Sequence, residues 1–600
     1  MKTRNLNSLT SDDLESILGA DPIVSLVGSG ISTYEPTDLP AGQSVTSAVL
    51  QVLSNLPGAS DQDEADQRQL DKLLAMIPFE ALMERCPSPQ KVRGIIFTLY
   101  GGGREPNGIH HSIAQLALNK RINSIITTNY DLALDEALRC AGAGLPLVVR
   151  DTDAPVGERA YFKIHGTASP NHEDTLVYSL RLEAAMPPWK RNLLEKLIHG
   201  RVFLVVGYSG FDFEVCPQIP KAKPHSVIWN FFEEKDMQTS PGYKRLVADG
   251  VAVIPLIGNV WTLLELLRCN ETETGRHRST ANVEHMLRSS FSKEELILWR
   301  INLLNSMGNG RLSLRTLKAT DNGPASYDRL RAYAESEHHR GQYRNAEKFY
   351  LRASKIAPDD LSRRMCLLDA SDEARCFGHW RRAEKLIDFA IERLPHSMSK
   401  LDRNGLRARE LLKRTLVLGQ WIQTTSKLAR LTTKVDKKDK LGLERRTKTS
   451  QAQAAEWISE GSGLAIVNGL WFDFQQYRLW AERMSLSASL VMSRGPFEPP
   501  PSREGYQQLG YSLALLMVNR DQAKREARSG SRTDRMADEL EQSLIVADHL
   551  GCHPEIWKLA HTLITLFRQR QVRYFRKLLW NFLLCQYAPT KRIPYLILGA

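Results

Sequence analysis

The stretch IVSLVGSGIS, residues 23–32, decides the fold that the sequence predicts for the first part of the chain. An apolar run of strand length leads directly into two glycines, Gly28 and Gly30, separated by one serine. Turns of this kind let α/β proteins bring backbone N–H groups close to a phosphate. A strand followed by a small-residue turn is nevertheless common, so the segments that follow must decide whether a nucleotide binds there.

Further short apolar runs indicate a mainly parallel sheet. None alternates strictly with polar residues, which is typical of strands covered on both faces. Between the first two strands, the segment from about 45 to 118 has apolar residues at three- and four-residue spacing and predicts a helical insertion. The sequence therefore predicts an α/β domain whose later strands cover 122–128, 161–166, 201–207, 225–231 and 251–257.

Small or polar residues stand at the ends of these strands, where open α/β sheets bind ligands. The segments are TTNYD at 127–131, HG at 165–166, GYSGF at 207–211 and Asn230. Each has a structural alternative: Asn129 or Asp131 can cap the next helix, and a lone histidine at a strand end is more often structural. So many at one edge exceed what caps and turns need, which predicts a single site.

The ordered set GSGIS, TTNYD, KIHG, GYSGFD and a late asparagine resembles the sirtuin-like NAD-consuming domain. The resemblance covers residues 15–268 and is closest to the prokaryotic branch used in defence against phages. It implies a Rossmann-like parallel sheet over residues 1–270, with NAD+ as the substrate. Ser29 stands where sirtuins have alanine, and Thr128 and Tyr130 replace their glutamine and isoleucine.

The resemblance also implies a role for each matching residue. Asn129 would orient the nicotinamide ribose and the attacking water, Asp131 would support that geometry, and His165 would be the base on the ribose side. The other NAD+ contacts would come from Gly28, Ser29, Gly30 and Ser32 at the diphosphate, Thr128 beside Asn129, and Gly207, Tyr208, Ser209, Asp212 and Asn230 along the adenosine half.

The implied reaction is cleavage of the bond between nicotinamide and ribose, with water giving ADP-ribose. Deacetylating sirtuins carry a four-cysteine zinc module, whereas the eight cysteines of this chain include no CxxC pair. The adjacent histidines His110 and His111 point in different directions on a helix, so no metal site is predicted. Hydrolysis is therefore favoured over an NAD-dependent deacylase or a non-enzymatic scaffold that senses NAD or ADP-ribose.

Beyond residue 270 the strand signals nearly vanish. A linker with connecting helices is expected at 271–324, and helix pairs that resemble tetratricopeptide repeats at 325–432. Two units align 37 residues apart, and a weaker third unit is expected near Gly419, Gln420 and Trp421. The basic stretch 434–448 is expected to be a solvated loop, with a nucleic-acid contact as the alternative, and 433–600 to be a helical sensor or assembly region. The aligned residues are Gly341, Tyr343, Ala346, Ala353 and Pro358 with Gly378, Trp380, Ala383, Ala390 and Pro395.

The net charge of the chain changes sign at about residue 270. Residues 1–270 carry 25 basic and 31 acidic side chains, a net charge of −6, and the remainder carries 55 and 37, a net charge of +18, which together give the +12 of the whole chain. A basic repeat region predicts an acidic protein partner, with nucleic acid as the alternative. The resemblance to defence proteins implies that this partner is a phage protein that acts as the trigger. Homo-oligomers are expected by resemblance, and the lack of a signal peptide or long apolar run predicts a cytoplasmic protein without membrane contact.

Overall fold

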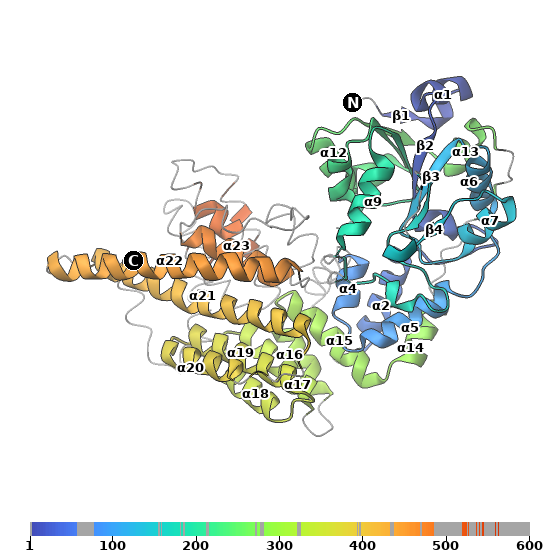
Figure 1. The fold of residues 1–600 in the computed structure, drawn as a ribbon. Coiled ribbons are helices and arrows are strands. Elements are labelled where there is room, and N and C mark those ends of the chain that lie inside the picture. The colour runs from blue at the N-terminus through green and yellow to red at the C-terminus, as the bar shows by residue number, and fades with distance from the viewer. Residues whose placement is uncertain are drawn as a thin grey trace, which may run out of the picture.

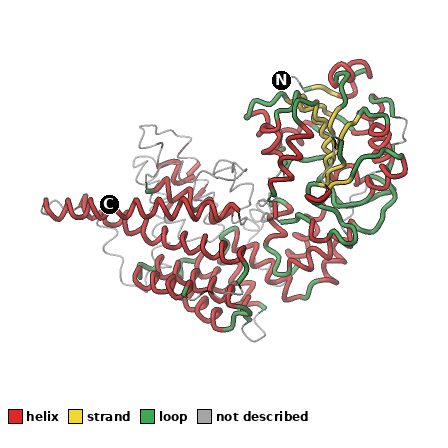
Figure 2. Tube along the Cα trace, in the orientation of Figure 1, coloured by secondary structure: helices red, strands yellow, loops and turns green. Residues whose placement is uncertain are grey.

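A computed structural model describes most of the chain as far as residue 484 and isolated positions between 519 and 562. The longer described ranges are 3–56, 77–153, 159–179, 186–211, 215–269, 281–320, 326–392, 398–431, 437–467 and 471–484. Figure 1 shows an α/β body followed by an all-helical part, and Figure 2 shows that the strands gather in the first of them. The predicted fold class is confirmed.

The α/β body is built on one eight-stranded sheet in which every strand pair is parallel. All six predicted strands are present, and two strands of two residues each, β1 and β4, extend the edges. The order is β1-β8-β7-β6-β2-β3-β5-β4, so the six longer strands have the Rossmann order with β2 as the first strand. Their bounds are Arg4–Asn5 (β1), Ile23–Val27 (β2), Ile122–Thr127 (β3), Leu147–Val148 (β4), Tyr161–Lys163 (β5), Val202–Val206 (β6), Ser226–Phe231 (β7) and Val253–Ile257 (β8).

Helices cover both faces of the sheet, which explains the apolar strands. Ile23 and Val27 of β2 face one apolar layer, and Val24 and Leu26 face the other. The first layer includes helices α1 (Ser11–Leu18), α6 (Gly108–Leu118), α7 (Ala133–Ala141) and α13 (Val260–Leu266). The second includes α9 (Pro188–Ile198), α10 (Ile219–Ala222) and α12 (Pro241–Ala248); the short α11 (Glu234–Thr239) follows β7.

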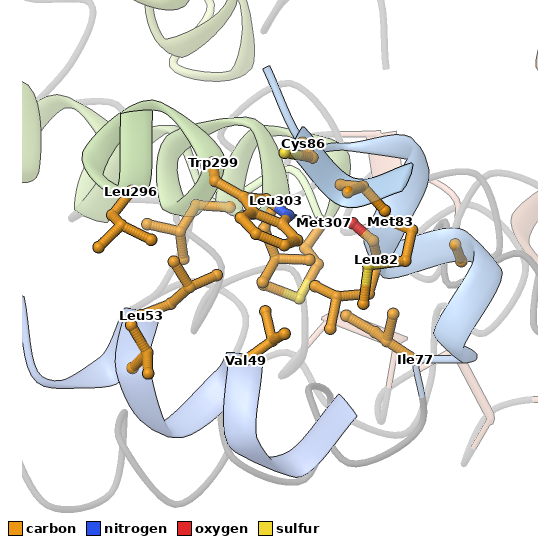
Figure 3. Close-up of a cluster of buried hydrophobic side chains, with 14 of the residues drawn as sticks. Val49, Leu53, Ile77, Leu82, Met83, Cys86, Leu296, Trp299, Leu303 and Met307 are labelled. Carbon is orange, nitrogen blue, oxygen red and sulfur yellow. Dashed lines mark hydrogen bonds between the residues drawn. The ribbon is translucent and has the colours of Figure 1, made fainter. Parts of the chain in front are cut away.

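The predicted helical insertion is confirmed, and it shares a core with helices that follow the sheet in sequence. Trp299 is 1% exposed, and its Nε1 donates to the carbonyl of Leu82 at 3.0 Å. Figure 3 shows the Trp299 ring within this cluster, among side chains from the insertion and from α15. The insertion consists of α2 (Gly42–Ser54), α4 (Phe79–Glu84) and α5 (Pro89–Tyr100), and the later helices are α14 (Ala281–Ser290), α15 (Lys293–Ser306) and α16 (Gly310–Ala319).

The two predicted repeat units are helix pairs. Gly341 and Gly378 have positive φ angles of 74° and 90° at the turn within each pair, a conformation that favours glycine. The paired alanines 346 with 383 and 353 with 390 are fully buried, so they allow close approach of the helices. The first pair is α17 (Tyr327–His339) and α18 (Tyr343–Lys355), and the second is α19 (Asp360–Cys376) and α20 (Trp380–Ile391). Pro395 lies outside the described residues.

Two expectations for the later helices are wrong. Gly419 and its neighbours lie inside the 32-residue helix α21 (Lys400–Leu431), so no third turn occurs there. A Cβ at Gly419 would come within 2.7 Å of the Trp480 ring of α23 (Trp471–Arg483), so this glycine makes room for a packed tryptophan. Most of the basic stretch 434–448 belongs to the helix α22 (Lys437–Val467) instead of a loop. None of the described helices is long and apolar enough to cross a membrane.

Candidate functional site

The candidate site lies at the carboxyl edge of the sheet, where the strand order reverses around β2. The register pairs Val27 of β2 with Thr127 of β3 and Val206 of β6, and Thr127 with Lys163 of β5. These four strands therefore end in one row, and the segments that follow them meet at the same edge. Parallel α/β sheets bind ligands at this switch point.

Glycines join the turns that follow β2 and β6. The Gly28 amide donates to the Val206 carbonyl at 3.0 Å, and the Gly30 amide donates to the Gly207 carbonyl at 2.9 Å. A Cβ at Gly28 would lie 2.5 Å from the Gly207 oxygen. Gly207 has a φ of 63° and a Cβ there would lie 2.8 Å from Ile31. Backbone packing therefore requires these glycines, and the diphosphate role expected for Gly28, Ser29 and Gly30 stays a prediction.

A buried hydrogen-bond network centres on Ser32, in the 3-10 turn Ser29–Thr33 after β2. The Ser32 hydroxyl donates to Asp131 Oδ2 at 3.0 Å, and the Asn129 amide donates to Ser32 Oγ at 3.3 Å. His110 Nε2 lies 3.3 Å from the same oxygen. The exposed fractions of these four side chains range from 0 to 5%. Three of the predicted residues, Ser32, Asn129 and Asp131, are thus brought together, along with a fourth that was not predicted.

Asn129 is held firmly and still has an unused acceptor. Its backbone N–H donates to the Thr127 hydroxyl at 3.1 Å, and that hydroxyl donates to the Val27 carbonyl at 2.8 Å. Its side-chain Oδ1 is buried and accepts no hydrogen bond from any described residue. A buried acceptor left unpaired costs free energy, so its position favours a water molecule or a ligand donor beside it.

A buried lysine donates a hydrogen bond to the backbone of Asp131. Lys163 is completely buried, and its Nζ donates to the Asp131 carbonyl at 2.5 Å and to Asp135 Oδ2 at 2.9 Å. The Tyr161 hydroxyl donates to the same Asp135 oxygen at 2.8 Å, and burial raises the Tyr161 pKa well above its ordinary value. Asp131 Oδ1 also accepts from the N–H of Ala133, the first residue of helix α7, at 3.1 Å.

His165 lies beside Tyr130. Its ring centroid is 6.5 Å from that of Tyr130, and its Nε2 is 4.0 Å from Glu183 Oε1. Both His165 and Glu183 are buried, at 4 and 1% exposed. Gly166 follows with a φ of 84°, and a Cβ there would collide with the Thr175 carbonyl, which explains the glycine of the predicted KIHG segment.

The edge formed by β6 and β7 is different, since two of its predicted residues, Tyr208 and Asn230, are buried and contact other parts of the protein. Tyr208 stacks on Trp229 with centroids 5.8 Å apart, and its hydroxyl lies 3.4 Å from Cys216 Sγ. The Asn230 amide donates to the Gly258 carbonyl at 3.0 Å. Ser209 is exposed, and Thr128 is partly buried. Asp212 lies outside the described residues, so the adenosine contacts remain predictions.

Three residues of the site escaped the sequence prediction: His110, Lys163 and Glu183. His110 was considered only as half of a metal-binding pair. The three-residue spacing between Asn107 and His110 is a sequence signal for a hydrogen-bonded His110 at the start of a helix. An N-cap residue and the third helical residue often bond reciprocally. Among the described residues no group of three or more histidine, cysteine, aspartate or glutamate side chains has metal-site geometry.

The strand order and the polar cluster at the switch point define a Rossmann-like α/β domain with a single candidate site at its carboxyl edge. Its family follows from sequence comparison: residues 123–222, from β3 to α10, match the SIR2-like domain. The chain therefore contains a SIR2-like domain, which is followed by the two repeated helix pairs formed by α17 to α20.

Other comparisons add little. A search of the curated proteins found no match. One solved structure that matches is a signal transduction ATPase with numerous domains from Pyrococcus horikoshii, which has a tetratricopeptide repeat sensor. It is 13% identical with a TM-score of 0.24, over 96% of this chain and 82% of that one, and at that score the likeness carries no conclusion here.

Proposed function

We propose that the N-terminal domain is an NAD+ hydrolase that converts NAD+ and water into nicotinamide and ADP-ribose. In this proposal it is the effector of an anti-phage abortive-infection system, and the helical C-terminal region binds the trigger. The observation that carries the proposal is the buried Oδ1 of Asn129. This acceptor has no partner in the described part of the chain, and it lies in a SIR2-like domain at the point where the motifs predict the nicotinamide ribose.

Buried side chains at this edge of the sheet suit the charge that this reaction develops. When the bond between ribose C1′ and the nicotinamide nitrogen breaks, the bonding electron pair leaves with nicotinamide and the ribose becomes cationic. Buried carboxyl groups such as Asp131 and Glu183 would stabilise a positive charge more strongly than water does. The Asn129 oxygen would accept a hydrogen bond from the attacking water, and the proton released as water adds to C1′ would pass to His165.

Packing supports a route from the helical region to the site. Helix α15 contacts the insertion through Trp299, and Ser88 at the start of α5 donates to Glu295 at 2.7 Å. At the other end of α5, the Tyr100 ring lies 5.7 Å from the Tyr130 ring. Apolar residues from beyond residue 519 are buried in the same cluster as α15, namely Ala523, Met536, Leu540, Leu544 and Leu559. A partner that displaces these residues would therefore act through α5 on Tyr130, the residue beside His165.

The decisive experiment is chromatography of the products after purified protein is incubated with NAD+, alone, with phage lysate, and with an acyl-lysine peptide. We expect lysate to trigger release of nicotinamide and ADP-ribose. Nicotinamide that appears only with the peptide, together with O-acyl-ADP-ribose, would indicate a deacylase. Bound NAD+ without any product under all three conditions would indicate a scaffold and refute the proposal.

A variant pair ties the activity to the site. Asn129→Ala should reduce turnover by about 10²-fold or more, because the water loses its acceptor. Asn119→Ala, at the exposed end of α6, is the matched control and should keep wild-type turnover. Equal activity of the two variants would remove Asn129 from the mechanism.

A further inference from the structure

We propose that His110 is a positioning residue for the NAD+ site, which acts by fixing the Ser32 hydroxyl and, through it, the orientation of the Asn129 amide. The inference rests on the proposed function and extends it to a residue outside the strand-end motifs. His110 lies in the first turn of α6, a helix that packs beside β3.

The hydrogen bonds of His110 define which ring nitrogen carries the proton. The backbone N–H of Asn107 donates to His110 Nδ1 at 3.2 Å, so Nδ1 must be the acceptor. The proton of the neutral ring is then on Nε2, which donates to Ser32 Oγ at 3.3 Å. Burial lowers the His110 pKa to about 3, so the ring stays neutral at any ordinary working pH.

Ser32 has one proton and two lone pairs, and all three are then committed. His110 and the Asn129 amide occupy the lone pairs, and the hydroxyl proton goes to Asp131. A rotated Asn129 amide would place its oxygen against a hydroxyl oxygen whose proton is engaged elsewhere, which is repulsive. The chain of donors that begins at Asn107 therefore keeps the Asn129 nitrogen on Ser32 and leaves Oδ1 for the ligand.

The competing explanation is that His110 only caps helix α6. Its Nδ1 completes a capping box with Asn107, whose side chain accepts from the Ile109 and His110 N–H groups. Two substitutions separate the roles because each keeps one of the two polar positions. His110→Asn retains an acceptor near Nδ1 and loses the donor to Ser32, whereas His110→Gln retains a donor near Nε2 and loses the acceptor for Asn107.

The test measures binding of carba-NAD, a non-cleavable analogue with a methylene in place of the ring oxygen of the nicotinamide ribose, by calorimetry, with a thermal melt for each variant. We expect His110→Asn to weaken binding about tenfold, the effect of one ordinary hydrogen bond. His110→Gln should recover most of that loss in affinity, and it should melt at a lower temperature than His110→Asn because it loses the acceptor for Asn107. If His110→Gln binds as weakly as His110→Asn, or more weakly, the capping explanation holds and the proposal is overturned.

Ser32→Ala provides a second measurement that leaves α6 untouched. If His110 acts through Ser32, then Ser32→Ala alone weakens binding about tenfold, and the double variant with His110→Asn is no weaker. Multiplied effects of about a hundredfold in the double variant would overturn the proposal. A Ser32→Ala protein with wild-type affinity would overturn it as well, and this single variant is informative even if the His110 variants fail to fold.

The same samples distinguish this proposal from the proposed function. A wild-type protein that binds carba-NAD but releases no nicotinamide from NAD+, with or without lysate, refutes hydrolysis, and the affinities of the variants still decide the role of His110. A wild-type protein that does not bind carba-NAD refutes both.

Discussion

The two halves of the sheet edge differ in what their side chains do. On the β2–β3–β5 half, polar groups bond to one another across segments far apart in sequence, as Ser32 does with Asp131 and His110. On the β6–β7 half, Tyr208, Trp229 and Phe231 stack in the interior with centroids 5.8 and 5.1 Å apart. One half contains a buried polar network, and the other half contains a packed aromatic cluster.

This difference teaches that a polar residue at a strand end does not by itself mark a ligand contact. Asn129 follows the buried parallel strand β3, and Asn230 lies near the end of the buried parallel strand β7. Both residues are buried. The Asn230 amide donates to the Gly258 carbonyl within the sheet, whereas the side-chain oxygen of Asn129 has no hydrogen-bond partner among the described residues. The hydrogen-bond partners separate the two, and those depend on tertiary structure.

The largest expected effect comes from breaking the glycine contact that joins the halves. Gly28→Ala would place a Cβ 2.5 Å from the Gly207 oxygen and 2.6 Å from the Tyr208 Cα, both backbone atoms. Such overpacking should cost about 3 kcal/mol and separate the β2 and β6 turns. Hydrogen exchange of peptides from β2 and β6 would report the loss.

Gly94→Ala is the control for that experiment. Gly94 is exposed within helix α5, and a Cβ there meets nothing within 4 Å. Alanine should therefore stabilise the protein by about 0.5–1 kcal/mol. Equal protection of β2 and β6 in the Gly28 and Gly94 variants would contradict the close contact between the two turns.

The next effect is acid sensitivity of the polar half. The unfolded chain protonates His110 near its ordinary pKa of 6.5, whereas the folded protein, because burial lowers this pKa to about 3, does not. The stability that neutral His110 contributes is complete above pH 6.5 and is lost as the pH falls toward 3. At about pH 5 the loss should reach about 2 kcal/mol.

Urea unfolding curves at about pH 7.5 and about pH 5 would measure this loss. In His110→Gln, which has no titrating ring, the drop between the two pH values should be smaller by that amount. An identical drop in both proteins would mean that His110 takes up a proton in the folded state as well, and the assigned donor direction would be wrong.

The sequence predicted the sheet well because each strand is a continuous apolar run bounded by turn residues. It missed β1 and β4, which are two residues long and leave no such pattern. The repeat units were found because small residues recur at a fixed spacing, yet Gly419 was misjudged. A glycine at the turn within a helix pair and a glycine that makes room for Trp480 are the same letter in a sequence.

The site was predicted in part for a similar reason. Residues at the ends of strands can be placed from the strands themselves, so Asn129, Asp131 and Ser32 were expected at one edge. His110 reaches that edge from the start of a helix, and Lys163 is the last residue of the short strand β5. Their contribution depends on how α6 and β5 pack against β3, which no local pattern encodes.

The smallest expected effect comes from replacing one tyrosine by phenylalanine in each half of the edge. The Tyr130 hydroxyl donates to the Val177 carbonyl at 2.5 Å, and the Val177 N–H donates to the His165 carbonyl at 2.9 Å. The Tyr208 hydroxyl instead lies 3.4 Å from Cys216 Sγ in the second apolar layer. Tyr130→Phe and Tyr208→Phe should each lose about 1 kcal/mol of stability or less.

Turnover of NAD+ should separate these two variants. Tyr130→Phe should lower it several-fold, because the loop that carries His165 loses a hydrogen bond, while Tyr208→Phe should change it less than about twofold. Weaker NAD+ binding in Tyr208→Phe would place that hydroxyl on the ligand, as the sequence resemblance implies. The part of the edge that contacts the ligand would then extend from β2 to β6, and the aromatic stack would contact the adenosine end of the substrate.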